Sequence, residues 1–407
     1  MKKIAIALIF FSNIIFSCTS QRGNSVSIST ERDDNGKRGK TTVNVTDEYG
    51  SVSFVTTEDV VFNEDETGVE GFKEGGSLKF KKDGKKLTAE TGDDGKIYYS
   101  YNGGAATQVL SEEGNKFLTK AIKTMIAYGV GAKGRAEKLF KKGGSSLVLD
   151  EIDKLKSDYT KTIYLNYLLS SSGLSQDELI TVINKIGTSV NSDFEKAKLL
   201  KENAPLFLSN TAMSDAYLVA VKGINSDFEK ANALKELLNK SLSDDQLQQV
   251  LDAAGSINSD FEKANLLKQT LQVNKLSPAQ FTAALKTISS INSDFEKSNV
   301  LKAALDGNGA EGEQFDEALA VIKSIGSDFE RANVLKKVIG AGTKTEKQWI
   351  SLINTTSSVG SDFEKANVLV DIANRMPESD NLKAVYMKAA KTISSDSEFG
   401  KVVKALK

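Results

Sequence analysis

The sequence repeats one short phrase whose side chains could do chemistry. Variants of Ser-Asp-Phe-Glu-Lys-Ala, such as NSDFEKAN at 258–265, contain Ser-Asp pairs that begin at residues 157, 192, 226, 259, 293, 327, 361 and 395. Most copies place two carboxylates within three residues of one another. Paired carboxylates can act as general acid and base, and a row of identical charged side chains could bind a ligand. The phrase therefore marks either a row of sites or a repeated way of starting a helix.

Composition excludes many kinds of site. The 407 residues include no histidine and one cysteine, Cys18, and the formal net charge is −1. Histidine bases, histidine-ligated metals and internal disulfides are therefore ruled out, and no Lys/Arg run suits nucleic acid. The sequence predicts a non-enzymatic protein with no catalytic residue, metal ligand or cofactor site. A hydrolase that uses carboxylates alone remains a minor alternative.

The spacing of the phrase predicts helices. Successive Ser-Asp pairs are 35, 34, 33, 34, 34, 34 and 34 residues apart. Serine at the N-cap and glutamate at N3 predict a reciprocal capping box, and aspartate at N1 suits the positive end of the helix dipole. Phe261, Ala264 and Leu267 recur at intervals of three residues. We expect them, and their equivalents, to form one buried apolar stripe.

A second helix lies between successive copies of the phrase. LSQDEL (174–179), LSDDQL (242–247), LSPAQF (276–281) and TEKQW (345–349) each place Ser or Thr three residues before Glu or Gln, another capping box. One such helical hairpin cannot bury its own apolar face, so neighbouring hairpins must stack. The sequence predicts an all-α solenoid of about eight 34-residue αα-hairpin repeats over 157–407, preceded by a helical entry cap over 111–156.

Residues 24–110 have a different pattern. Alternating runs such as SLKFKK (77–82) are separated by Asp-Gly and Asn-Gly turns, the strongest short hairpin signature. They predict a small antiparallel β-meander whose apolar face packs on the first helices. The fold class is therefore α+β, a β-rich head followed by the solenoid.

The first residues predict export and lipidation. Residues 1–17 have two lysines and then an apolar stretch too short for a membrane span, as in a secretory signal peptide. The sequence IFSC resembles a bacterial lipobox, which implies cleavage before Cys18, lipid attachment at Cys18 and a tether over 18–23. Thr19 follows the cysteine, which by analogy with Gram-negative sorting favours the outer membrane. The side of the membrane that the protein faces stays open, and a plain signal peptide is the alternative.

The order of these segments resembles a known kind of region. Strands containing VFNEDETGVEGFKEGGSLKF (61–80) precede AEKLFKKGGSSLVLDEIDKLKSDYTKTIYLNYLL (136–169) and then the serial SDFEKA units. This is similar to the extracytoplasmic repeat region of certain bacterial envelope proteins, which is also fused to β-lactam-sensing antirepressor-type membrane metallopeptidases. Those peptidases use a His-Glu-x-x-His motif, which this chain lacks. The resemblance implies a module associated with envelope sensing.

One recurrent residue is a mediocre helix former, and two interpretations of it stay open. This ladder comprises Asn232, Asn265, Asn299, Asn333 and Asn367. The asparagines either hydrogen-bond to the adjacent repeat or contact a ligand. The sequence predicts an envelope lipoprotein, anchored in the membrane by its lipid, that offers the solenoid surface to a protein or peptide partner. An accessory regulator of a membrane peptidase or envelope-stress sensor is the alternative.

Overall fold

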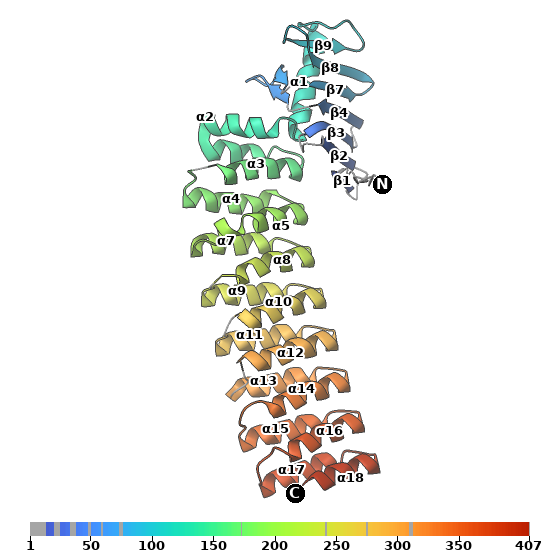
Figure 1. The fold of residues 1–407 in the computed structure, drawn as a ribbon, viewed down its shortest axis with the longest axis vertical. Coiled ribbons are helices and arrows are strands. Elements are labelled where there is room, and N and C mark those ends of the chain that lie inside the picture. Colours follow the sequence, from blue (N-terminus) through green and yellow to red (C-terminus); the bar gives the residue numbers. More distant parts are fainter. Residues whose placement is uncertain are drawn as a thin grey trace, which may run out of the picture. The chain divides into compact units, whose positions relative to one another are not determined.

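The predicted α+β architecture is confirmed: an antiparallel sheet precedes a long series of helical repeats (Figure 1). The computed structural model describes residues 14–19, 25–32, 38–47, 50–57, 60–72, 76–171, 173–240, 242–273, 276–308 and 312–406. The chain forms two compact units. The first comprises Met1–Glu178 with Ser189–Asn191, and the second comprises Leu179–Thr188 with Ser192–Lys407.

The head is an antiparallel meander. Its seven-stranded sheet has the order β1-β2-β3-β4-β7-β8-β9, and β5 and β6 form a separate pair. The strands are β1 (Ile14–Thr19), β2 (Ser25–Arg32), β3 (Arg38–Asp47), β4 (Gly50–Thr57), β5 (Val60–Phe62), β6 (Val69–Phe72), β7 (Ser77–Lys82), β8 (Lys85–Thr91) and β9 (Ile97–Tyr101). Asp83 and Gly84, between β7 and β8, both have positive φ, as the predicted Asp-Gly hairpin requires.

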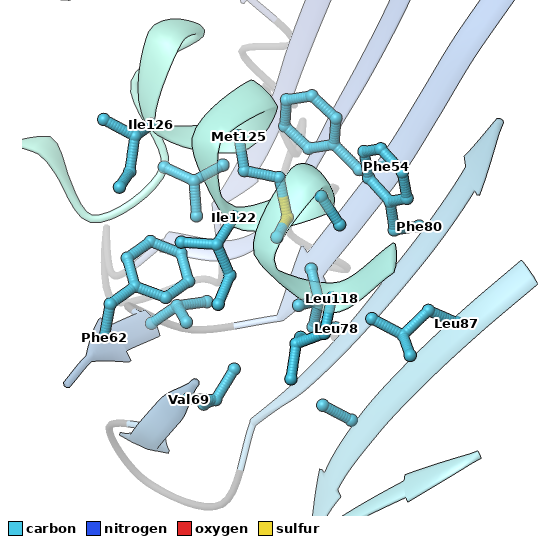
Figure 2. Close-up of a cluster of buried hydrophobic side chains, with 14 of the residues drawn as sticks. Phe54, Phe62, Val69, Leu78, Phe80, Leu87, Leu118, Ile122, Met125 and Ile126 are labelled. Carbon is cyan, nitrogen blue, oxygen red and sulfur yellow. The ribbon is translucent and has the colours of Figure 1, made fainter. Parts of the chain in front are cut away.

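One face of the sheet is apolar, and helix α1 (Glu112–Ala127) covers it. Alternation turns Leu78 and Phe80 of β7 to the same side, where they meet Ile122 and Met125 of α1 (Figure 2). All four side chains are buried. The predicted packing of the β-rich segment on the first helices is confirmed.

Strand β1 overlaps the predicted signal peptide. It pairs with β2, where Cys18 lies opposite Val26. Residues 1–13 and 20–23 lie outside the described residues, so the signal peptide, the tether and lipidation at Cys18 stay predictions. Cleavage before Cys18 would remove most of β1 and leave β2 at the edge of the sheet.

In the second unit the helices from α5 onward, apart from the short α6, alternate between two columns (Figure 1). One column contains α5, α8, α10, α12, α14, α16 and α18, and the other contains α7, α9, α11, α13, α15 and α17. The helices are α2 (Ala132–Ile152), α3 (Asp158–Ser170), α4 (Gln176–Ser189), α5 (Asp193–Glu202), α6 (Ala204–Phe207), α7 (Thr211–Lys222), α8 (Asp227–Leu238), α9 (Asp244–Gly255), α10 (Asp260–Val273), α11 (Pro278–Ser289), α12 (Asp294–Asn308), α13 (Gly312–Lys323), α14 (Asp328–Gly340), α15 (Glu346–Ser357), α16 (Asp362–Ala373), α17 (Asp380–Ala390) and α18 (Asp396–Ala405). None of the helices in the described ranges is both long and apolar enough to cross a membrane.

The first unit extends beyond the predicted entry cap and includes α3, the first helix of the predicted solenoid. Two side chains of α3 explain this. Tyr159 packs against the apolar core of the head, and the hydroxyl of Tyr164 accepts a hydrogen bond from Arg135 at 3.1 Å. The first repeat helix is therefore part of the unit that contains the sheet.

Capping differs between the two kinds of helix. The second helices have the predicted boxes, for example Ser277 with Gln280 and Thr345 with Gln348. In the first helices the predicted bond to the serine hydroxyl is confirmed, and the predicted bond from the serine amide to the N3 glutamate is wrong. The Ser259 hydroxyl accepts from the Glu262 amide at 3.3 Å, but the Ser259 amide donates to Asp227 of the preceding repeat, at 2.8 Å.

This aspartate contact is the repeated junction between hairpins. From α5 to α16, the N1 carboxylate of each first helix accepts the backbone N–H of the next repeat's N-cap serine at 2.8–2.9 Å, in the pairs Asp193–Ser226, Asp227–Ser259, Asp260–Ser293, Asp294–Ser327, Asp328–Ser361 and Asp362–Ser395. In five of the six junctions it also accepts the N–H of the residue before that serine. The predicted interaction with the helix dipole is therefore joined by a stronger contact between repeats.

A basic side chain at N4 completes each of the six junctions, a buried lysine in five of them and Arg331, which donates to the Ser358 carbonyl at 2.9 Å, in the sixth. Lys263, at N4, is 5% exposed, and its ammonium donates to the Ser290 hydroxyl at 2.9 Å, at the end of the second helix of its own repeat and directly before the next first helix. Lys196, Lys230, Lys297 and Lys365 are also buried and donate to the equivalent turn. A cation at the C-terminal end of a helix is favoured by the helix dipole.

In three repeats the N3 glutamate has a partner in the preceding repeat. Glu296 pairs with Lys268 at 3.1 Å, Glu262 with Lys235 at 3.7 Å, and Glu330 with Lys302 at 4.0 Å. The serine, the aspartate and the basic residue of the phrase start a helix or join two repeats, and these three glutamates also join repeats. The scaffold interpretation of these four residues accounts for their contacts.

We predict that Asp260→Ala weakens one junction. It leaves the amides of Asn292 and Ser293 without their acceptor, which should cost about 2 kcal/mol. Hydrogen exchange at these two amides should accelerate, and the melting temperature should fall. Asp245→Ala is the matched control, because Asp245 is an exposed carboxylate in the first turn of α9. Equal losses in both variants would mean that only the helix dipole matters, at about 0.3–1 kcal/mol each.

Candidate functional site

The phenylalanine of the phrase is the residue that the junctions leave exposed. The predicted buried stripe is wrong at this position, because the six rings retain between 50% and 60% of their accessible surface. They are Phe194, Phe228, Phe261, Phe295, Phe329 and Phe363. We call these six residues the phenylalanine column.

The helical period explains the error. Ala264 and Leu267 are fully buried, and positions three apart step back by about 60° around a helix. Phe261 therefore lies about 120° from Leu267, at the margin of the buried face. Together the six rings expose on the order of 600 Å² of apolar surface, which is large for one monomer surface feature.

The first repeat shows what an aromatic ring at this position does when an apolar surface is within reach. Tyr159 stands at N2 of α3, and it packs against the buried cluster of the head. The last repeat has Ser397 at N2 of α18. The aromatic position is thus used for docking in the first repeat, exposed in the next six, and polar in the last.

The asparagine ladder lies beside the phenylalanine column. Asn265 is four residues after Phe261 in α10, so both side chains lie on one face of the helix, and the same spacing recurs in four other helices. All five asparagines are half-buried. The predicted bond to the adjacent repeat is not seen for any of them within the described ranges. Their alternative role as ligand contacts stays a prediction.

A shallow, open hollow adjoins the asparagine ladder in the C-terminal repeats. A groove of about 610 Å³ is lined by Lys336, Asn367, Asp371, Lys401 and other residues of α14, α16 and α18. Lys401 occupies the asparagine position of α18, and its ammonium lies 6.0 Å from the centroid of Phe363. A side chain at this position therefore reaches the ring of the preceding repeat.

The phenylalanine column and asparagine ladder form the candidate site, which we call the Phe–Asn face. It combines apolar rings with amides that can both donate and accept hydrogen bonds. The phenylalanine and asparagine side chains can contact a ligand but do not themselves titrate. Among the described residues, no three carboxylate or cysteine side chains cluster in a way that could hold a metal ion.

A second hollow, in the first unit, is better explained by structure. It has a volume of about 500 Å³ and is lined by Phe62, Arg135 and Lys138 among others. The Arg135 side chain is 14% exposed and pairs with Glu66 and Glu151. Burial acts to lower the Arg135 pKa, but the hydrogen bond with Glu66 and the interaction with Tyr164 raise it overall, so the cation is retained. These charges hold the β5–β6 pair against α2.

No protein-family model matches the chain, and no curated protein matches it. One similar solved structure is described as the computational design of self-assembling cyclic protein homooligomers. It is 10% identical, and the similarity covers 70% of this chain and 96% of that chain with a TM-score of 0.14. That score is too low to support any argument about this protein.

The column should be dispensable for folding. We predict that Phe261→Ser, Phe295→Ser and Phe329→Ser each change the free energy of unfolding by less than about 0.5 kcal/mol, since the rings are mostly exposed. Leu267→Ala, at a fully buried position of the same helix as Phe261, should cost about 2–5 kcal/mol. Chemical denaturation measures both. Losses of similar size at Phe261 and Leu267 would contradict an exposed column.

Proposed function

We propose that this protein is a non-enzymatic binding module, and that the Phe–Asn face of its solenoid holds an extended segment of a protein or peptide partner. One observation carries the proposal: six phenylalanines at one repeat position are exposed, whereas the serine and aspartate of the phrase are engaged in helix caps and junctions. Stability does not require an aromatic residue at an exposed site, whereas burying a ring against a partner stabilises a complex.

The spacing of the column suits an extended chain. Neighbouring packed helices are about 8–10 Å apart, so successive rings recur at about that distance. A polyproline II chain rises about 3.1 Å per residue and completes a turn in three residues, about 9.3 Å. A β-strand returns to the same face every two residues, about 6.6 Å, which does not match. The favoured partner therefore has an apolar residue at every third position.

The asparagines complement such a partner. A polyproline II chain has no internal hydrogen bonds, so its backbone carbonyl and amide groups are available. An asparagine amide can donate to the first and accept from the second. One half-buried asparagine, placed a helical turn from each ring, would fix the depth and register of the bound chain.

The proposed location follows from the N-terminal residues. We propose an envelope protein anchored by a lipid on Cys18, most simply at the bacterial outer membrane. The support is the position of the only cysteine in the chain, directly after an apolar stretch and a serine. Anchoring would keep the binding module at the membrane that holds its partner.

The Phe–Asn face can be tested with a displayed library of unstructured peptides. We expect the protein to select peptides with an apolar residue at every third position. Their affinity should fall about a hundredfold or more for the triple variant Phe261→Ser/Phe295→Ser/Phe329→Ser, because burying the exposed part of each ring contributes about 1 kcal/mol. Fluorescence anisotropy with the selected peptides measures this.

Val219→Ser is the matched control. Val219 is 61% exposed on α7, in the other column of helices. Selected peptides should bind this variant as they bind the unchanged protein. Peptides that bind the triple phenylalanine variant equally well would rule out the Phe–Asn face as the binding site.

The anchor has its own test. Cells that express the full chain and take up radiolabelled palmitate should label the protein, and Cys18→Ala should abolish the label. Labelling that persists in this variant, or its absence from the unchanged protein, would contradict lipidation at Cys18. Neither result bears on the Phe–Asn face, so the two parts of the proposal can fail separately.

A further inference from the structure

Five lysines converge on one groove in the first unit. The groove has a volume of about 580 Å³ and lies between α1 and the end of β7, with the turn before α3 alongside. Lys116, Lys120 and Lys123 come from one face of α1, Lys82 from β7, and Lys156 from the turn. No acidic residue lines this groove in the described part of the chain.

Most lysines of the groove lack a paired carboxylate among the described residues. Isolated lysines elsewhere in the unit, such as Lys133 on α2, also lack one, so the groove is distinguished by the convergence of several such lysines on one hollow. In the groove, Lys116 pairs with Glu112, but Lys82, Lys120, Lys123 and Lys156 form no ion pair with any described residue. Four uncompensated ammonium groups around one hollow repel one another, in a chain whose total charge is nearly balanced.

The fold requires this helix but not its lysines. The opposite face of α1 carries Leu118, Ala121, Ile122 and Met125, all buried against the sheet. Lys120 and Lys123 are exposed and contribute nothing to that packing. A concave surface lined by one sign of charge concentrates the field and attracts counter-ions.

We propose that this groove binds the phosphate groups of a multivalent anionic ligand. A single carboxylate would neutralise one of the four free ammonium groups, whereas neighbouring phosphates would neutralise several. Lysines suit such a ligand because each is a compact charge on a flexible stem, able to reach phosphates whose positions vary. Phospholipid headgroups and a soluble polyphosphate offer the same chemistry, and the experiment separates these two sources.

Acetylation rates of individual lysines measure occupancy in the full chain. The protein is held in neutral phosphatidylcholine vesicles and compared with the same vesicles plus tripolyphosphate, and with vesicles that contain phosphatidylglycerol. Acetylation of Lys120 and Lys123 should slow several-fold with one or both probes. Lys133 and Lys142, exposed on α2 outside this groove, should keep their rates and serve as internal controls. Protection by vesicles alone identifies the lipid headgroup as the source, and protection by tripolyphosphate identifies a soluble ligand.

The variant Lys120→Gln/Lys123→Gln should weaken binding of the active probe about thirtyfold. Lys133→Gln/Lys142→Gln removes the same net charge and should leave binding unchanged. An unaltered circular dichroism spectrum shows that the groove variant remains folded. Equal weakening by both variant pairs, or no protection by either probe at low salt, would overturn the proposal.

Discussion

The solenoid depends on one contact, the aspartate carboxylate that accepts backbone amides from the next repeat. An N-cap serine cannot satisfy its own N–H, and the sequence offers a glutamate at N3 for that purpose. In the structure, the carboxylate of Asp227 in the preceding repeat accepts the Ser259 N–H instead. The equivalent aspartates accept the N–H of the later N-cap serines in the same way. Each helix start is therefore satisfied by its neighbour, so a hairpin is completed only when it stacks.

This contact has consequences for the other residues of the phrase. Because the aspartate occupies the serine amide, the N3 glutamate is free to pair with a lysine of the preceding repeat, as Glu296 does with Lys268. The N4 lysine closes the junction from the other side by reaching the end of the next second helix. The position between aspartate and glutamate points away from the junction, and phenylalanine there has no part in it.

Much of the fold could be predicted from sequence because its determinants are local. Asp-Gly turns, alternating strands, N-cap serines and the 34-residue period each depend on a few adjacent residues, and the structure has them. What could not be predicted depends on the neighbouring repeat. An aspartate at N1 can stabilise the helix dipole or accept a hydrogen bond from the next repeat. The sequence fits both interactions, and only the stacked structure shows that the second one forms.

The binding surfaces illustrate the same limit. Phe261 fits an apolar stripe at intervals of three, but the 60° drift per step could have shown that it lies at the margin. The docking of Tyr159, at the same position of the first repeat, could not be predicted, because Tyr159 packs against an apolar cluster whose residues precede it by many positions in the chain. From sequence alone, the lysines of α1 form an ordinary solvent-exposed helix face. The groove becomes apparent only in the structure, which places Lys82 and Lys156 beside them.

The two proposed surfaces differ in the force that would hold a ligand, and this follows from how each is built. The Phe–Asn face is formed by translation, so its strength grows with the number of repeats that a partner spans, and apolar contacts of this kind are little affected by salt. The lysine groove is formed once, by β7, α1 and the turn before α3 in the first unit, and exposed charges are screened within about 10 Å at 0.1 M salt. A protein with both surfaces can therefore hold an extended partner along the repeats while its head responds independently to local anionic charge.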